Sequence, residues 1–288
     1  MKKEGIKSTY RKVMKKLDSL SPLGYSTSGV VEKVGEGVTE FEAGDRVACA
    51  GADLANHAEF VSIPKNLAVK VPANVDLSDA AFTTVASIAM QGVRQADLRL
   101  GETCAVIGLG LLGQLTIQFL KASGINVAGI DINSDMVNLA KKSGADLALK
   151  RGSGEEKQTI QNMADGYGVD SVIITAGTSS LDPVEFAGDI CRQKGKVVIV
   201  GAVPTGFSRE NYYKKELELR MATSYGPGRY NPEYEEKGLD YPIGYVRWTE
   251  NRNMQAFLEL LKNDKIDLSH LTTHTFDFGN APNAYQMI

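Results

Sequence analysis

The sequence predicts an α/β protein built around a doubly wound parallel sheet. Strand-like and helix-like segments alternate from Glu102 to Met221, which implies right-handed crossovers between parallel strands. The first of these strands, within Cys104–Gly113, runs into a turn with glycines at 108, 110 and 113. The next apolar run, Val127–Asp131, ends in an acid. This succession of strand, turn, helix, strand and acid is typical of a dinucleotide-binding unit.

The three glycines have separate expected roles. Gly108 permits the tight turn, Gly110 lets the backbone approach a pyrophosphate, and Gly113 lets the helix pack close to the strand. The helix N-terminus offers free N–H groups and a positive dipole end to the phosphates. Asp131 can accept hydrogen bonds from both ribose hydroxyls and would repel a 2′-phosphate, which favours NAD over NADP. The alternative is another α/β fold with a glycine-rich turn, such as a methyltransferase.

The remaining elements of this region follow from the same alternation. The expected strands are Cys104–Gly108, Asn126–Ile130, Asp146–Leu149, Ser171–Thr175, Lys196–Val200 and Glu218–Ala222. The expected helices are Leu112–Ser123, Ser134–Ser143, Glu155–Ala164 and Pro183–Gln193. Ligands bind at the carboxyl ends of such strands, although ordinary turns are equally rich in small residues. The predicted cofactor-binding residues are Gly108, Gly110, Leu111, Leu112, Gly113, Asp131, Ile132, Ala176, Gly177, Gly201, Ala202 and Val203.

The N-terminal part of the chain lacks the alternation of strands and helices. Short strands and glycine turns between Leu23 and Lys70 predict a small barrel or sandwich, with strands at Gly29–Val34, Arg46–Ala50 and His57–Ile63. A helix is expected at Ala80–Gln95. Residues 1–20 predict an amphipathic helix that docks on the protein body, and a helix lying on a membrane surface is the alternative.

Composition restricts the function classes. The chain has 288 residues, 43% of them hydrophobic and 23% charged, as in soluble globular proteins. A net charge of −3 gives no electrostatic basis for binding nucleic acid or an anionic membrane. The three scattered cysteines, Cys49, Cys104 and Cys191, form no CxxC pair. No run is long enough to span a bilayer and no secretory segment is evident, so a cytoplasmic location is expected.

One stretch carries a family resemblance. Residues 23–47, LGYSTSGVVEKVGEGVTEFEAGDRV, resemble the signature of the medium-chain dehydrogenase/reductase superfamily, which includes the zinc alcohol dehydrogenases. The resemblance implies a GroES-like catalytic barrel in residues 1–85 and 223–288, with an inserted Rossmann NAD-binding domain in residues 86–222. It also implies NAD-dependent interconversion of an alcohol and a carbonyl in a small-molecule substrate. A homodimer joined through the Rossmann sheets is expected as well.

The chain departs from that family at its metal ligands. Members with catalytic zinc carry Gly-His-Glu where this chain has Gly24-Tyr25-Ser26, and the third-ligand position aligns with Thr84. The lobe of four cysteines that binds structural zinc is absent. His270 and His274 are too far apart for a shared metal on the strand expected at Leu271–Phe278. No metal site is therefore predicted. Because only 23 residues precede Gly24, the barrel is expected to be incomplete and the chain to be truncated.

A second resemblance narrows the subfamily. Tyr225–Met254 is rich in Tyr, Gly, Pro and Arg, contains the only tryptophan, and is predicted to be irregular. It resembles a segment of bacterial bi-domain oxidoreductases, in which a zincless dehydrogenase half is fused to a C-terminal sugar-dehydrogenase-like (Gfo/Idh/MocA-type) half. Tyr225, Arg229 and Tyr230 are candidates to bind the hydroxyls or an anionic group of a sugar-like substrate. A surface loop pinned by buried tyrosines is the alternative.

The predicted function is a zinc-independent, NAD-dependent oxidoreductase for a polar, sugar-derived substrate. Without zinc, the substrate oxygen needs hydrogen-bond donors and a proton relay. Tyr25 is the first catalytic candidate, followed by Ser26, His57 and Thr84; His57 alternatively packs in a turn. One alternative function is a catalytically incomplete NAD-binding module of a larger bi-domain enzyme. Another is a quinone-reductase-like oxidoreductase, against which Asp131 counts.

Overall fold

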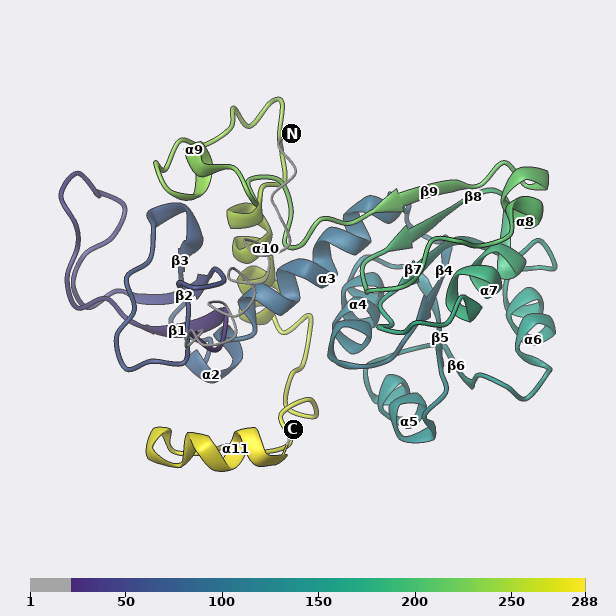
Figure 1. Ribbon diagram of the computed structural model, residues 1–288, viewed down its shortest axis with the longest axis horizontal. Helices are drawn as coiled ribbons and strands as arrows, with labels where there is room; N and C mark the ends of the chain where they lie inside the picture. The colour runs from purple at the N-terminus through teal and green to yellow at the C-terminus, as the bar shows by residue number, and fades with distance from the viewer. Residues whose placement is uncertain (1–21, 288) are drawn as a thin grey trace, which may run out of the picture.

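Two β-sheets organise the chain. A computed structural model describes residues 22–287, and Figure 1 shows one sheet at each end of the molecule with helix α3 (Thr83–Ala96) running between them. The first sheet has three strands in the order β1-β2-β3, and the second has six in the order β6-β5-β4-β7-β8-β9. The helix predicted for residues 1–20 lies outside the described residues.

The six-stranded sheet is parallel throughout. Its order reverses direction between β4 and β7, which places a topological switch point at the carboxyl ends of these two strands. The predicted α/β class with a doubly wound parallel sheet is therefore confirmed. The strands are β4 (Thr103–Ile107), β5 (Asn126–Asp131), β6 (Leu147–Lys150), β7 (Val169–Ile174), β8 (Cys191–Ile199) and β9 (Glu218–Met221).

Helices cover both faces of this sheet, so its strands are apolar on both sides. In β4, Cys104 and Val106 pack into the core formed with α3, α4 and α5, whereas Ala105 and Ile107 pack into the core formed with α6 and α7. The helices of this region are α4 (Leu111–Ala122), α5 (Ser134–Lys142), α6 (Glu156–Met163), α7 (Asp182–Ile190) and α8 (Arg209–Lys214). All but the short α8 correspond to predicted helices.

The three-stranded sheet is antiparallel and differs in part from the prediction. It consists of β1 (Ser26–Val30), β2 (Arg46–Ala50) and β3 (Ala68–Lys70). The strand predicted at His57–Ile63 is wrong, because this segment pairs with no strand among the described residues; the N–H of His57 donates instead to the carbonyl of Leu23 at 2.8 Å. Of the strand predicted at Gly29–Val34, only the first two residues belong to β1.

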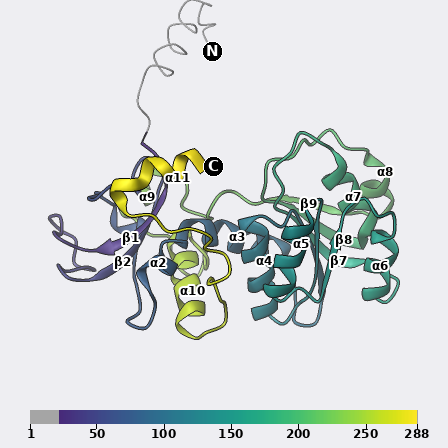
Figure 2. The ribbon, with the colours of Figure 1, turned by 90° about the horizontal axis from the view of Figure 1, so that it is seen from below.

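Helix α3 is shared by both ends of the molecule. The helix predicted at Ala80–Gln95 is divided into α2 (Leu77–Ala80) and α3. Helix α10 (Glu250–Lys262) packs beside α3 (Figure 2). Their apolar faces form one core with the antiparallel sheet. At the other end of α3, a Cβ at Gly92 would lie 2.5 Å from Cγ2 of Val200, directly after β8. Because no side chain intervenes, α3 packs tightly on the parallel sheet.

Two further predictions near the C-terminus are wrong. The stretch Tyr225–Met254 is not irregular throughout, because it contains α9 (Pro232–Glu235) and the first turn of α10. The strand predicted at Leu271–Phe278 is wrong: the segment pairs with no strand of residues 22–287, and its Phe276 and Phe278 are exposed. The last described helix is α11 (Ala281–Met287). Among residues 22–287, no helix is long and apolar enough to cross a membrane.

Candidate functional site

The glycine turn after β4 is shaped by close backbone contacts. Gly108 has a φ of +95°, and a Cβ there would lie 2.5 Å from the backbone nitrogen of Ala176. A Cβ at Gly113 would lie 2.1 Å from the carbonyl oxygen of Gly108. A side chain at either position would displace backbone, so both glycines are needed for the turn and for the seating of α4 on the sheet.

Gly110 differs from its two neighbours because open space surrounds it. No atom lies within 4 Å of the position that its Cβ would occupy, and it is the N-cap residue of α4. The first N–H groups of a helix lack partners within the helix, and they carry the positive end of its dipole. The N-terminus of α4, at Leu111, Leu112 and Gly113, therefore combines free N–H groups with room for an anion.

Asp131 lies at the end of β5, beside this turn. Its Oδ2 atom accepts a hydrogen bond from the N–H of Leu109 at 2.6 Å, and its Oδ1 atom accepts one from the N–H of Asn133 at 2.8 Å. These bonds fix the carboxylate next to the glycine turn. A carboxylate has about four acceptor positions, so two remain for a ligand. The following residue, Ile132, leaves 76% of its surface exposed.

The loops after β7 and β8 adjoin the same turn. A Cβ at Gly201 would lie 2.1 Å from the carbonyl oxygen of Ala176, and the N–H of Thr178 donates to the carbonyl of Ala202 at 2.9 Å. Gly177 has open space in place of a side chain. The structure thus brings the residues predicted to bind cofactor together along one edge of the sheet, where β4, β7 and β8 end.

Three of the predicted catalytic residues meet at the start of α3. The Ser26 hydroxyl donates to the carbonyl of Ala81 at 2.6 Å and accepts from the N–H of Thr84 at 3.1 Å. The Thr84 hydroxyl, fully buried, donates to the carbonyl of Tyr25 at 3.0 Å. Both hydroxyls are therefore engaged in joining β1 to α3. Of the three side chains, only Tyr25 is substantially exposed, at 46%.

His57 lies beside these residues and has an unpredicted partner. Its Nδ1 atom is hydrogen-bonded to the hydroxyl of Tyr285 on α11, and its ring fills the space that a side chain at Gly24 would need. Tyr285 is 228 residues away in sequence, so no local signal could have identified it. The contact places α11 next to the segment that carries Tyr25.

The predicted substrate-binding residues are adjacent but unequally accessible. The Arg229 guanidinium lies 5.2 Å from the ring centre of Tyr225 and 4.2 Å from that of Tyr230, and it pairs with Glu235 at 2.6 Å. Tyr230 is 68% exposed, whereas Tyr225 is only 3% exposed and its hydroxyl has no partner among the described residues. Burial raises the pKa of Tyr225 above its ordinary value. Tyr225 is thus far less accessible to a ligand than Tyr230, and its role in substrate binding stays a prediction.

Sequence reasoning also missed Glu250, the first residue of α10. Its side chain is fully buried, and neither carboxyl oxygen has a hydrogen-bond partner among the described residues. Burial, reinforced by Glu235, raises the pKa of Glu250 to about 9, although Arg229 acts in the opposite direction. An acid in the first turn of an amphipathic helix is ordinarily exposed, so the sequence carries no signal for this burial.

The donor set does not fit a zinc ion. No group of three His, Cys, Asp or Glu side chains that could hold a metal occurs within residues 22–287. Cys49 is buried, and burial raises the pKa of its thiol to about 12. His270 is hydrogen-bonded to Ser143 at 2.9 Å, and His274 to Thr273 at 3.1 Å.

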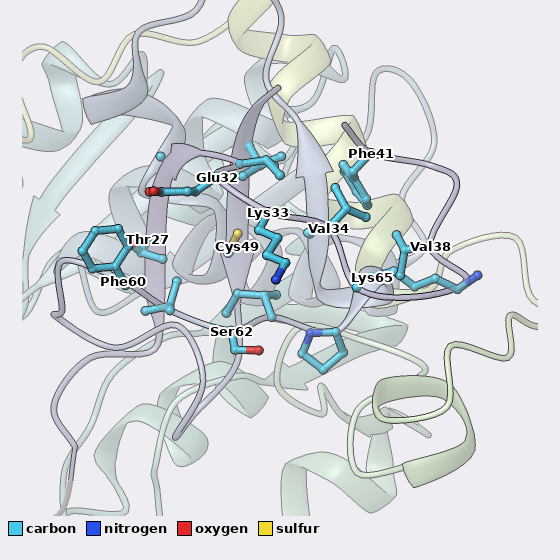
Figure 3. Close-up of a pocket in the computed structure, with 18 of the residues that line it drawn as sticks. Thr27, Glu32, Lys33, Val34, Val38, Phe41, Cys49, Phe60, Ser62 and Lys65 are labelled. Atoms are coloured by element: carbon cyan, nitrogen blue, oxygen red, sulfur yellow. The ribbon is translucent and has the colours of Figure 1, made fainter. Parts of the chain in front are cut away.

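A separate hollow of about 840 Å³ lies over the antiparallel sheet (Figure 3). Its walls come from β1, from residues 31–41, from residues 58–65 and from residues 236–238. Phe41 and Cys49 contribute apolar surface to it. None of the residues predicted to bind cofactor or to act in catalysis lines this hollow, so it is distinct from the strand-end site.

The chain matches two family models and several known dehydrogenases. Residues 112–239 match the zinc-binding dehydrogenase family, and residues 5–73 match the alcohol dehydrogenase GroES-like domain. The chain is 27% identical over 271 residues to D-guloside 3-dehydrogenase of Escherichia coli (strain K12), covering 91% of this chain and 72% of that protein. It is 26% identical over 298 residues to sorbitol dehydrogenase of Halalkalibacterium halodurans, covering 92% and 79% of the two chains.

Solved structures have the same fold. The alcohol dehydrogenase TADH from Thermus sp. ATN1 superposes with a TM-score of 0.77 at 21% identity, covering 97% of this chain and 85% of that chain. Galactitol-1-phosphate dehydrogenase from Escherichia coli superposes with a TM-score of 0.73 at 21% identity, covering 92% and 82%. These similarities support a relationship to the zinc-type alcohol dehydrogenase-like family, and the named relatives indicate an oxidoreductase of the medium-chain type.

Replacing Ser26 with alanine tests the structural role of its hydroxyl. We expect Ser26→Ala to lower the free energy of unfolding by about 1–3 kcal/mol, because the N–H of Thr84 loses its acceptor and the bond to Ala81 is lost. Urea denaturation measures this loss. The matched control is Ser62→Ala, at an exposed serine, with an expected change within about 0.5 kcal/mol. Equal effects of the two substitutions would contradict the assignment.

Proposed function

We propose that this chain is a zinc-independent, NAD-dependent oxidoreductase that interconverts an alcohol and a carbonyl on a polar, sugar-derived substrate. The observation that carries the cofactor assignment is the open space at Gly110 beside the anchored carboxylate of Asp131. The relatives named for D-guloside and sorbitol support a polyhydroxylated substrate. Two structures of similar fold are bound to NADP and NADH, which supports a nicotinamide cofactor.

The residues at the strand ends fit a dinucleotide. The N–H groups at the start of α4 would bind the pyrophosphate, and the remaining acceptor positions of Asp131 would bind the ribose hydroxyls. The negative charge of Asp131 would repel a 2′-phosphate, which favours NAD. When bound, the nicotinamide would donate or accept a hydride. We assign residues 86–222 to cofactor binding, and residues 1–85 and 223–288 to the substrate; α3 crosses the first boundary.

Tyr25 is the proposed proton donor and acceptor at the substrate oxygen. Its phenol is exposed, whereas the hydroxyls of Ser26 and Thr84 are committed to backbone carbonyls and hold the Tyr25 segment against α3. A phenol can donate a hydrogen bond to a carbonyl and accept one from an alcohol. Arg229 and Tyr230 are proposed to contact polar groups of the substrate.

The substitution Gly110→Val tests the cofactor site without disturbing the fold. Its side chain would occupy open space, so we expect the fold to be kept, with a loss of about 1 kcal/mol because valine is a poorer N-cap residue than glycine. NADH binding should weaken at least about tenfold, because the side chain would stand where the pyrophosphate approaches. Calorimetry with NADH and NADPH measures both affinity and preference. Retained affinity in Gly110→Val, or a preference of the unaltered protein for NADPH, would contradict the proposal.

Elemental analysis tests zinc independence. Protein purified from zinc-supplemented medium and then dialysed should contain substoichiometric zinc, because Tyr25, Ser26 and Thr84 stand at the positions of the family's ligands. Addition of a chelator should leave the unfolding temperature and NADH affinity unchanged. A reproducible content of one zinc per chain would overturn this part of the proposal.

We also propose a homodimer joined through the parallel sheets. Strand β9 is the outermost strand, its outer edge pairs with no strand of residues 22–287, and its Leu219 and Met221 are 39% and 59% exposed. Sedimentation equilibrium should give twice the chain mass, and Met221→Lys should weaken association. A monomer at all concentrations would refute the proposed dimer.

The cytoplasmic location and the fusion to a sugar-dehydrogenase-like half stay predictions from the sequence.

A further inference from the structure

The segment that joins β9 to α10 is held against the start of that helix. It comprises residues 222–249, which we call the connecting segment, and it carries both Arg229 and Tyr230. The N–H of Glu250 donates to the carbonyl of Pro227 at 2.8 Å, and the Asn253 amide donates to the carbonyl of Tyr225 at 3.0 Å. The backbone just before Gly228 is thus fastened to the first turn of α10.

The carboxyl group of Glu250 lies inside this contact. It is fully buried, and a Cβ at Gly228 would lie 2.9 Å from its Oε1 atom, so the backbone of the connecting segment passes directly over it. Both oxygens lack hydrogen-bond partners among the described residues. Arg229, the cation whose charge acts on Glu250, is paired with Glu235 at 2.6 Å. Within residues 22–287, no basic group forms an ion pair with Glu250.

The surroundings of this carboxyl oppose a negative charge. A buried carboxylate without an ion pair costs several kcal/mol, so such groups take up a proton instead. The dipole of α10 favours the charged form. Two of its early N–H groups are engaged elsewhere, that of Glu250 with the carbonyl of Pro227 and that of Arg252 with the Thr249 hydroxyl. The charged or titratable groups facing Glu250 are Glu235, Arg229, Tyr225 and Tyr234. Burial and Glu235 outweigh Arg229 and raise the pKa of Glu250 to about 9.

We propose that Glu250 is a positioning residue whose uncharged carboxyl group keeps the connecting segment packed on α10 and so holds Arg229 in place for the substrate. Ionisation of Glu250 puts a second negative charge next to Glu235 in a buried contact and releases the segment. The role of Glu250 in holding the connecting segment on α10 is inferred from the buried contact alone. Its consequence for substrate binding rests on the proposed function of Arg229.

The only tryptophan of the chain reports on this contact. Trp248 lies in the connecting segment two residues before Glu250, with the guanidinium of Arg94 3.3 Å and that of Arg247 3.9 Å from its ring centre. In the unaltered protein we expect a change in tryptophan emission with a midpoint near pH 9. This change should be missing in Glu250→Gln, which is neutral at every pH. Titration of Arg94, whose pKa burial and Arg247 lower to about 10, affects both proteins equally.

Limited proteolysis gives an independent measurement. Trypsin sites at Lys237 and Arg247 lie in exposed parts of the connecting segment. With a pKa near 9, the ionised fraction of Glu250 rises about 75-fold between pH 7 and pH 9.5, so cleavage should accelerate at least about tenfold. Rates in Glu250→Gln at each pH correct for trypsin itself. Identical pH profiles of the two proteins, in cleavage and in emission, would overturn the proposal.

A second variant keeps the test decisive if Glu250→Gln does not fold. Glu235→Gln removes the neighbouring negative charge and frees Arg229, so the midpoint should move to lower pH; an unchanged midpoint would count against the proposal. Because folding raises the pKa of Glu250, the contribution of this residue to the free energy of unfolding is full below about pH 4.5. It is lost as the pH rises to about 9. NADH binding, measured separately at the Gly110 site, distinguishes failure of this inference from failure of the proposed function.

Discussion

The contact of backbone with backbone at the carboxyl ends of β4, β7 and β8 is the constraint on which the strand-end site depends. Gly108 lies against Ala176, Ala176 lies against Gly201, and Gly113 lies on Gly108. Any side chain at these glycines would drive the loops apart. The same contacts seat the N-terminus of α4 at the switch point, so the geometry that closes the sheet edge also presents the free N–H groups.

The two halves of the candidate site are built differently. On the parallel sheet, backbone atoms and one carboxylate provide the binding groups, and little depends on side-chain rotamers. On the antiparallel side, the hydroxyls of Ser26 and Thr84 form hydrogen bonds that join β1 to α3. The phenol of Tyr25 is the exposed side chain of the three. The hydroxyls of Ser26 and Thr84 thus serve to anchor the backbone.

The parallel sheet could be predicted because its signals are local. Strands buried on both faces are continuous apolar runs, and the glycine turn has a fixed spacing, so both are visible in a short window of sequence. Short strands such as β3 and the exposed segment from His57 to Ile63 depend on which partner strand is near. The burial of Glu250 and the pairing of His57 with Tyr285 likewise arise only from packing between distant segments. No pattern of neighbouring residues encodes them.

Helix α3 is attached near its two ends to different parts of the candidate site. Thr84 at its first turn is bonded to the Tyr25 segment, and Gly92 near its other end is wedged against Val200, next to the loop at Gly201. The Tyr25 segment and the residue that precedes the Gly201 loop are therefore attached to one helix. The eight residue steps from Thr84 to Gly92 set the spacing between these two attachments to about 12 Å.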